Sequence, residues 1–482
     1  MCNCQNKFEQ SRRQFLRTAS LASMSGLYAS PFILGLNSLA AMAQGTGASD
    51  YRALVCVFLQ GGNDGHGTVI ATDSDSYSAF TTARSGAPGL AYPLAQLLPI
   101  TLNTPQSGRT FALNPYLGGI QNLFNNSRAA IVANTGTLIV PATKTQVNAN
   151  SVPLPDSLFS HFDQTAAWQA IASNGGSAEH VGWGGAVADL IESMNMNSNS
   201  MFTCISTAGI ALFLSGQTSF QLNVTPAGPI PISGLAQPLF GQTTSSAALN
   251  SILTAEETNL FAKEYEVVVN RSIQAQALLA SSMLPAGPGG VPNPSQFLDP
   301  VTNMLTDNQL ALSLQTVARI IGGRASLGVN RQIFYVQLGS FDTHDGQAPT
   351  HARLLTQLGE ALEYFDGLMQ SAGLGNQVTT FTASDFGRTL TCNSDGTDHG
   401  WGSHHFVVGG AVQGHDMYGQ YPVIGVNQAN DVGAGRLIPT TAVDQYAGTL
   451  ARWFGLSDGQ VRQVFPNFAN FGSSPYLGFM GS

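Results

Sequence analysis

Acidic and histidine side chains recur in this sequence at the points where apolar segments end. An aspartate follows residues 53–59, an aspartate and a histidine follow residues 333–338, and a further aspartate follows residues 378–382. The carboxyl ends of parallel strands meet at one edge of an open α/β sheet, so we expect these side chains to lie close together. With one histidine a little further downstream, the set consists of Asp64, Asp342, His344, Asp385 and His399.

A cluster of carboxylates and imidazoles predicts a divalent metal site. Such groups repel one another or titrate unfavourably unless a cation neutralises them, and their mixed nitrogen and oxygen donors suit divalent ions. Asp342 and His344 are two residues apart, so an extended backbone points both side chains the same way. The pattern predicts one or two ions without distinguishing zinc, manganese, calcium and magnesium. The structural alternative is that an aspartate beside glycine, such as Asp64, bonds only to its own turn.

Two further side chains are candidates for catalysis. Ser160 precedes a predicted helix, and a hydroxyl at a helix N-terminus feels the positive end of the helix dipole, which favours an attacking alkoxide. The alternative is that Ser160 is a plain helix cap, with Asp163 completing a capping box. Arg388 comes shortly after Asp385 and is a candidate for gripping the oxygens of a charged ester, because guanidinium binds oxyanions in a bidentate manner. Its alternative role is an ion pair.

Strands that alternate with helices must position these residues. Continuous apolar runs at 53–59, 129–133, 333–338 and 378–382 predict strands that are covered on both faces. Apolar residues at helical spacing predict helices over 312–321 and 354–369, and near 446–454. This order predicts an α/β fold with a mostly parallel sheet sandwiched between helices.

One long stretch departs from this alternation. Residues 201–250 contain no Asp, Glu, Lys or Arg, and they include strand-like pieces such as 220–224. We expect an inserted, charge-poor, β-rich excursion at about 185–255 that lies over the sheet, followed by a helix over about 255–283. No linker separates independent units, so residues 44–482 are predicted to form one domain.

The first 43 residues indicate a twin-arginine signal peptide. Arg12 and Arg13 precede a broken apolar run at 21–39, and Ala41-Met42-Ala43 supplies the small residues that a signal peptidase accepts. We therefore expect the mature chain to begin near Gln44. The twin-arginine export machinery would carry it, already folded, into the periplasm or out of the cell.

Composition narrows the choice of partners. The formal net charge is −9 and charged residues make up only 10% of the chain, which argues against nucleic acid as a partner. Beyond the signal peptide, no apolar segment is long enough to predict a membrane span. Cys204 and Cys392 leave a disulfide open, since the sequence alone does not decide their pairing.

Five ordered motifs carry a family resemblance. They are Phe58-Leu59-Gln60-Gly61-Gly62-Asn63-Asp64-Gly65, Ser160-His161-Phe162-Asp163, Phe341-Asp342-Thr343-His344, Ser384-Asp385-Phe386-Gly387-Arg388-Thr389 and Gly396-Thr397-Asp398-His399-Gly400. The chain resembles the exported family catalogued as domain of unknown function 1501, which in turn is similar to the alkaline phosphatase and sulfatase superfamily.

That resemblance implies a sandwiched α/β sheet with metals at the strand ends. It implies one metal site built from Asp342, His344 and His399, and a second built from Asp64, Asp385 and Ser160, with Ser160 as the nucleophile. The superfamily commonly has histidine at the position of Phe386 and spaces the Asp342 and His344 equivalents more widely. The second site is therefore expected to be weak, vacant or rebuilt with His404 or His161.

Two functions follow as hypotheses. The first is an extracytoplasmic metal-dependent hydrolase of phosphate or sulfate esters, acting on a small-molecule or polymer substrate. The second is a secreted binding or surface-matrix protein that keeps the fold without catalysis, which the charge-poor excursion and Phe386 favour. Metal content together with turnover of an aryl phosphate or sulfate separates the two.

Overall fold

A computed structural model describes residues 50–87, 89–172, 178–235, 237–238, 241–242, 244–255 and 259–481. The predicted signal peptide, its cleavage site and Gln44 lie outside the described residues. The main sheet has the strand order β10-β9-β8-β13-β1-β14-β17-β5-β18, with β19 paired to β5. Its strands are β1 (Arg52–Leu59), β5 (Ala129–Gly136), β8 (Cys204–Ser206), β9 (Gln221–Thr225), β10 (Gly228–Pro229), β13 (Arg331–Leu338), β14 (Val378–Ser384), β17 (Ser403–Val408), β18 (Met417–Tyr418) and β19 (Thr441–Ala442).

The centre of the sheet is parallel and one side of it is mixed. Strand β1 pairs in parallel with β13 and with β14, and β13 pairs in parallel with β8. Strand β17 is antiparallel to both β14 and β5. All four predicted strands are present, as β1, β5, β13 and β14, and the mostly parallel α/β fold is confirmed.

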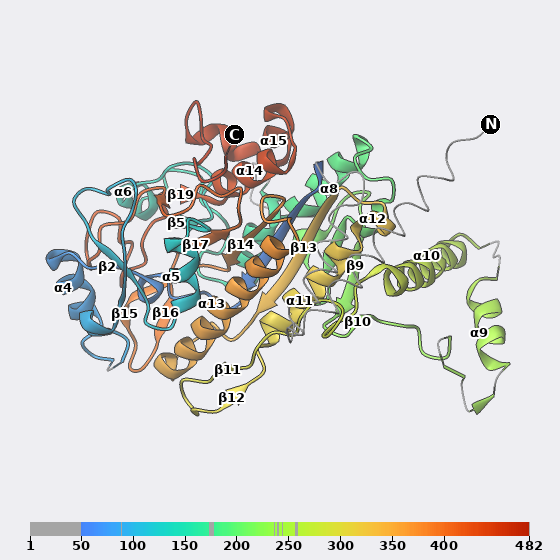
Figure 1. Ribbon diagram of the computed structural model, residues 1–482. Coiled ribbons are helices and arrows are strands. Elements are labelled where there is room, and N and C mark those ends of the chain that lie inside the picture. The colour runs from blue at the N-terminus through green and yellow to red at the C-terminus, as the bar shows by residue number, and fades with distance from the viewer. Residues whose placement is uncertain are drawn as a thin grey trace, which may run out of the picture.

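Helices cover both faces of this sheet (Figure 1). On β1, Val55 and Val57 face the core that contains α5, α11 and α13, whereas Cys56 and Phe58 face the core that contains α8, α14 and α15. Successive side chains of a strand point to opposite faces, so a strand buried on both faces is apolar throughout. The helices are α5 (Gly118–Asn125), α8 (Trp183–Ser193), α11 (Gln309–Gly322), α13 (Gln347–Ser371), α14 (Val443–Phe454) and α15 (Asp458–Val464).

The charge-poor segment extends one edge of the sheet, and its residues 211–214 also pack on one face of the sheet. Strand β8 pairs with β13, β9 pairs with β8, and β10 pairs with β9, so the segment forms one edge of the main sheet. Among the described residues, the expected excursion therefore lies over the sheet only around Phe213 and Leu214, and its strands extend the edge of the sheet instead. Helices α9 (Ser245–Leu253) and α10 (Leu260–Ser282) follow it and extend to one side of the molecule (Figure 1).

Shorter elements surround this frame. The remaining helices are α3 (Gly65–Thr68), α4 (Ser74–Ala83), α6 (Lys144–Asn148), α7 (His161–Gln169) and α12 (Arg324–Leu327), with single helical turns that include η4 (Leu212–Leu214). Small sheets join β2 (Val69–Ala71), β3 (Leu98–Ile100) and β4 (Phe111–Leu113); β6 (Ala170–Ala172) and β7 (Ala178–Gly182); β11 (Phe297–Leu298) and β12 (Leu305–Thr306); and β15 (Arg388–Cys392) and β16 (Thr397–His399).

Two further observations concern membrane spans and cysteines. Within the described part of the chain, no helix combines the length and the hydropathy needed to cross a membrane. Cys204 and Cys392 are both free thiols, as is Cys56. The disulfide that the sequence left open is therefore not formed.

Candidate functional site

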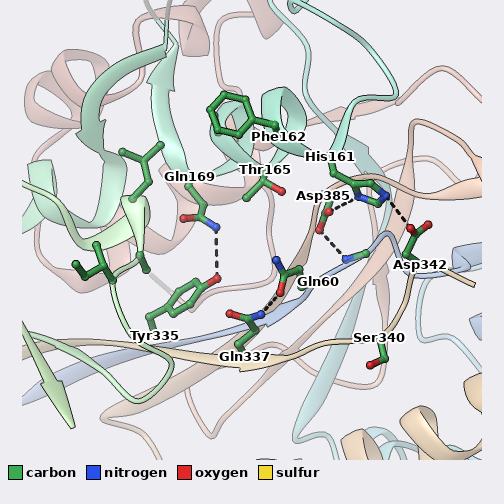
Figure 2. Close-up of a pocket in the computed structure, with 15 residues that line it drawn as sticks. Gln60, His161, Phe162, Thr165, Gln169, Tyr335, Gln337, Ser340, Asp342 and Asp385 are labelled. Atoms are coloured by element: carbon green, nitrogen blue, oxygen red, sulfur yellow. Dashed lines mark hydrogen bonds and ion pairs between the residues drawn. The ribbon is translucent and has the colours of Figure 1, made fainter.

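Three histidine rings converge on one carboxylate beyond the carboxyl ends of the central strands. His344 Nε2 lies 3.1 Å from Asp342 Oδ1, and His399 Nε2 lies 3.3 Å from the same oxygen. His161 Nε2 lies 3.3 Å from Asp342 Oδ2 (Figure 2). We call these four residues, His161, Asp342, His344 and His399, the histidine cluster.

Each of the three rings is held through its other nitrogen. His161 Nδ1 donates to Asp385 Oδ2 at 2.7 Å, and His399 Nδ1 donates to the carbonyl oxygen of Phe159 at 2.7 Å. His344 Nδ1 lies 3.3 Å from Asp398 Oδ1. An Nδ1–H that is committed to an oxygen leaves the Nε2 lone pair of a neutral ring free, which is how proteins prepare metal-binding histidines.

The Nε2 atoms of the three rings are placed so that a cation could bind between them. His344 Nε2 and His399 Nε2 face each other at 2.9 Å, and two lone pairs at that distance repel unless a proton or a metal lies between them. The buried Nε2 of His161 has no hydrogen-bond partner, although it lies close to Asp342. Ligand atoms of His161, Asp342 and His399 all fall within 4.8 Å of one another. The donor set of the histidine cluster therefore fits a divalent metal.

The pKa shifts of His399 and Asp342 suit metal binding, whereas the shift of His161 favours its protonated ring. Burial lowers the pKa of His399, which keeps the ring neutral and its Nε2 available. Burial raises the pKa of Asp342, but its hydrogen bond to Arg388 and the charge of that guanidinium outweigh burial and lower the pKa below its usual value. The hydrogen bond to Asp385 raises the pKa of His161. Because its pKa is lowered, the carboxylate of Asp342 is ionised at neutral pH.

Arg388 supports the cluster from behind. Its side chain is fully buried and donates from Nη1 to Asp342 Oδ1 at 2.7 Å and to the carbonyl oxygen of Gly61 at 3.1 Å. Its Nε and Nη2 donate to Thr397. A guanidinium that is buried and committed in this way positions Asp342 and is not free to grip a substrate, which corrects the sequence-based expectation.

Asp64 does not join the histidine cluster. Its buried carboxylate forms a bidentate pair with Arg84 at 2.6 and 2.8 Å and accepts from Gln347 Nε2 at 2.7 Å. Its Oδ1 also accepts from the Gly67 amide at 3.1 Å, as the cap of helix α3. The charge of Arg84 holds the pKa of Asp64 below its usual range despite burial. A metal would have to displace Arg84, so Asp64 is not a candidate ligand.

Phe386 closes the cluster on one side. Its buried ring lies 4.8 Å from the ring of His161 and 4.7 Å from that of His399, measured between centroids. Gly62 has φ +85°, and a Cβ there would lie 2.6 Å from the Phe386 ring, so glycine is needed for the turn after β1 to pass this close. An apolar ring therefore occupies the place where the resemblance expects a metal-binding histidine.

Family comparison agrees with the ordered motifs. A family model described as "Protein of unknown function (DUF1501)" matches residues 51–465. The chain belongs to the DUF1501 family. No curated protein sequence matches it.

Solved structures with some likeness to this DUF1501 protein include a sulfatase. PsFucS1 sulfatase from Pseudoalteromonas sp. has 9% identity and a TM-score of 0.31, covering 89% of this chain and 72% of that chain. The lipoteichoic acid synthase LtaP from Listeria monocytogenes has 8% identity and a TM-score of 0.31, covering 91% and 80%. Ps i-CgsB has 8% identity and a TM-score of 0.32, covering 86% and 74%.

Ser160 is the N-cap of helix α7 in this DUF1501 protein. Its hydroxyl accepts from the Asp163 amide at 3.5 Å, which is the capping interaction that the sequence allowed. The next residue, His161, is the first residue of the helix and reaches the cluster. Ser160 is thus adjacent in the chain to a cluster residue, and its role as nucleophile stays a prediction.

Two other histidines were weighed from the sequence as possible ligands. From the sequence, His161 or His404 was expected to replace the missing ligand if the second metal site was rebuilt. His161 joins the histidine cluster, whereas the buried His404 accepts from the Asn134 amide at 3.0 Å and stacks on Tyr421. The contact of His161 Nδ1 with Asp385 Oδ2 holds His161 in the cluster, and His404 has no such contact.

Proposed function

We propose that this protein is an extracytoplasmic, metal-dependent hydrolase of phosphate or sulfate esters. The proposed metal site is the histidine cluster, with His161, Asp342, His344 and His399 as ligands. The observation that carries the proposal is the convergence of three Nε2 lone pairs on one ionised carboxylate, each ring being held through Nδ1.

The donor set narrows the metal. Three imidazole nitrogens and one carboxylate suit zinc or another borderline first-row ion, whereas calcium and magnesium prefer oxygen ligands. Phe386 offers no donor on one side of the cluster, and the Asp64 carboxylate is committed to Arg84. We therefore propose one metal ion and not the pair that the resemblance implies.

Hydrolysis requires an activated hydroxyl and stabilisation of negative charge. A bound divalent metal supplies both, because it polarises an ester oxygen and lowers the pKa of a nearby hydroxyl. Arg388 and Asp385 hold Asp342 and His161 in place, so the ligands need little rearrangement. Ser160 is the proposed attacking hydroxyl, and the N-terminus of helix α7 favours negative charge beside it.

The second candidate function is a secreted binding or surface-matrix protein. Three observations favour it: Arg388 is committed to Asp342, Ser160 already caps a helix, and Phe386 replaces an expected ligand. Under this alternative the metal would stabilise the loops after the strands without turnover.

Turnover of aryl phosphate and aryl sulfate esters separates the two functions. We expect the exported protein to hydrolyse at least one of these esters, to lose activity after chelation, and to regain it when zinc or manganese is added. Metal binding without turnover of either ester would favour the binding role. Activity that is insensitive to chelation would reject metal dependence.

A further inference from the structure

A cleft of about 580 Å³ opens beside the histidine cluster. Its lining runs from His161 and Asp342 at one end to Gln169 and Tyr335 at the other (Figure 2). Ligand-binding clefts commonly enclose about 300–1,000 Å³, so this space is large enough for a small organic group next to the metal site.

Away from the cluster, the described lining of the cleft is uncharged and mixes apolar with polar side chains. Asp385 lies at the cluster end, where His161 engages it, and no lysine or arginine lines the cleft. The wall contributed by residues 210–212 belongs to the charge-poor segment. The polar side chains of the lining are Gln60, Thr165, Gln169, Tyr335, Gln337 and Ser340.

These side chains pair in ways that leave both donors and acceptors free. Gln337 Nε2 donates to Gln60 Oε1, which leaves the amide nitrogen of Gln60 and the amide oxygen of Gln337 available. Gln169 Nε2 donates to the Tyr335 hydroxyl at 3.4 Å, so the Tyr335 hydroxyl proton is free to donate. The Thr165 hydroxyl has no hydrogen-bond partner among the described residues.

Apolar groups border the same cleft. Phe162 is 84% exposed and Ile210 is 85% exposed, although both side chains are strongly apolar. Phe162 directly follows the cluster residue His161 on helix α7 and lines the cleft. A flat exposed ring beside mixed hydrogen-bonding groups offers a surface for the C–H face of a saturated ring.

We propose that this cleft binds the neutral, hydroxyl-rich part of the ester, namely a sugar unit that carries a single phosphate or sulfate group. The proposal rests on the proposed hydrolase function. Hydroxyl groups both donate and accept, so they match the free amides and hydroxyls of the lining. They would also leave few of those polar groups buried without a partner.

The two competing occupants fit less well. A polyanionic chain would meet no cation in the described lining, and it would approach a protein of formal net charge −9. A purely aromatic leaving group would cover the amide groups of Gln60 and Gln337 without hydrogen-bonding them, which carries a desolvation penalty.

Binding without turnover tests this proposal separately from the hydrolase function. Saturation-transfer NMR and titration calorimetry would be run on the intact exported protein with three probes. The first is a set of methyl glycosides of glucose, galactose, mannose and N-acetylglucosamine, the second is a multiply sulfated disaccharide, and the third is phenol. We expect at least one neutral glycoside to bind at millimolar concentration, more tightly than the sulfated disaccharide or phenol.

Cleft variants locate the binding. The double variant Gln60→Leu/Thr165→Val removes two hydrogen-bonding groups from the surface and should weaken binding of the neutral glycoside about tenfold. Phe162→Ala, an exposed change that leaves the core intact, should also weaken it, whereas Gln420→Leu, outside the cleft lining, should not. Metal content should equal wild type in all three.

Each outcome decides the proposal. Binding only of the sulfated disaccharide, only of phenol, or of none of the probes overturns it, as does glycoside binding that survives both cleft variants. Glycoside binding without ester turnover leaves the cleft assignment standing and rejects the hydrolase function. Turnover of an aryl ester without glycoside binding does the reverse.

Discussion

Replacing Arg84 with methionine should destabilise the protein by about 3–5 kcal/mol, because the Asp64 carboxylate would be left buried without its charge partner. The two side chains are 0% and 1% exposed, and the guanidinium contacts both carboxylate oxygens. Gln347 and the Gly67 amide would still donate to Asp64, but neither carries a positive charge. Methionine keeps most of the side-chain volume, so cavity formation adds little.

Two comparison variants isolate the electrostatic part. Arg84→Met combined with Asp64→Asn removes both charges, so it should be more stable than Arg84→Met alone. Arg452→Met breaks a surface ion pair in which Arg452 Nε lies 3.4 Å from Asp458 Oδ1, and the two side chains are 54% and 63% exposed. Its loss should lower the free energy of unfolding by about 1 kcal/mol or less. Urea unfolding followed by circular dichroism gives the free energy of unfolding of each variant.

The contribution of the Asp64–Arg84 pair to stability should depend on pH. The folded-state pKa of Asp64 is depressed, so the pair stabilises the fold above the unfolded pKa of about 4, and this stability is lost as the pH falls. The difference in free energy of unfolding between wild type and Arg84→Met should therefore become smaller in acid. Equal stability of Arg84→Met and Arg452→Met at neutral pH would refute a structural role for Asp64, as would loss of metal from folded Arg84→Met.

Three further changes have defined outcomes. Ser160→Ala should cost about 1 kcal/mol as a lost cap, and should slow ester turnover by a factor on the order of a thousand if Ser160 is the nucleophile; earlier melting with unchanged turnover rejects that role. Replacing Arg12 and Arg13 with lysine should leave the precursor in the cytoplasm, and normal export on cell fractionation would contradict the signal assignment. Burial raises the pKa of Asp444 to about 7. Stability should therefore fall as the pH rises from about 4 to about 7, and Asp444→Asn should abolish this fall in urea titrations.

The sheet was predictable because its central strands are buried on both faces. Strand β1 is apolar from Ala53 to Leu59 and β13 from Ile333 to Val336, and such apolar runs can be recognised in a single sequence. Among the edge strands, β9 matches the strand-like piece expected at 220–224, whereas β8 and β10 were not predictable. Strands β8 and β10 have three and two residues, and β8 pairs with a β13 residue more than a hundred positions away. Nothing local in a charge-poor sequence indicates that partner.

The site was predictable to the extent that it follows the strand ends. Asp342, His344, Asp385 and His399 were grouped from that rule, and the structure brings Asp342, His344 and His399 together. Asp385 lies behind them, where its carboxylate contacts His161 Nδ1 and is not one of the four clustered donors. The same rule failed for Asp64, because its carboxylate forms an ion pair with Arg84 at the C-terminal end of helix α4. No pattern links those two residues in the sequence.

The roles of His161 and Arg388 depend on tertiary contacts. His161 was an alternative ligand in the sequence, and what places it in the cluster is the 2.7 Å contact of its Nδ1 with Asp385. Arg388 was a candidate for binding a substrate oxyanion, with an ion pair as its alternative role. The turn after β1 and the β15–β16 hairpin enclose it in an ion pair with Asp342. Burial of a charged side chain is set by packing, which the sequence does not reveal.

The metal content of the exported protein tests the central claim most directly. Inductively coupled plasma mass spectrometry should find about one zinc or similar divalent ion per chain, bound by the histidine cluster. His344→Ala and His161→Ala should lose most of it. His415→Ala should keep it, because that ring stacks on Phe124 and bonds to the Phe124 carbonyl oxygen. Wild-type protein without metal, or equal metal in all three variants, would contradict the account.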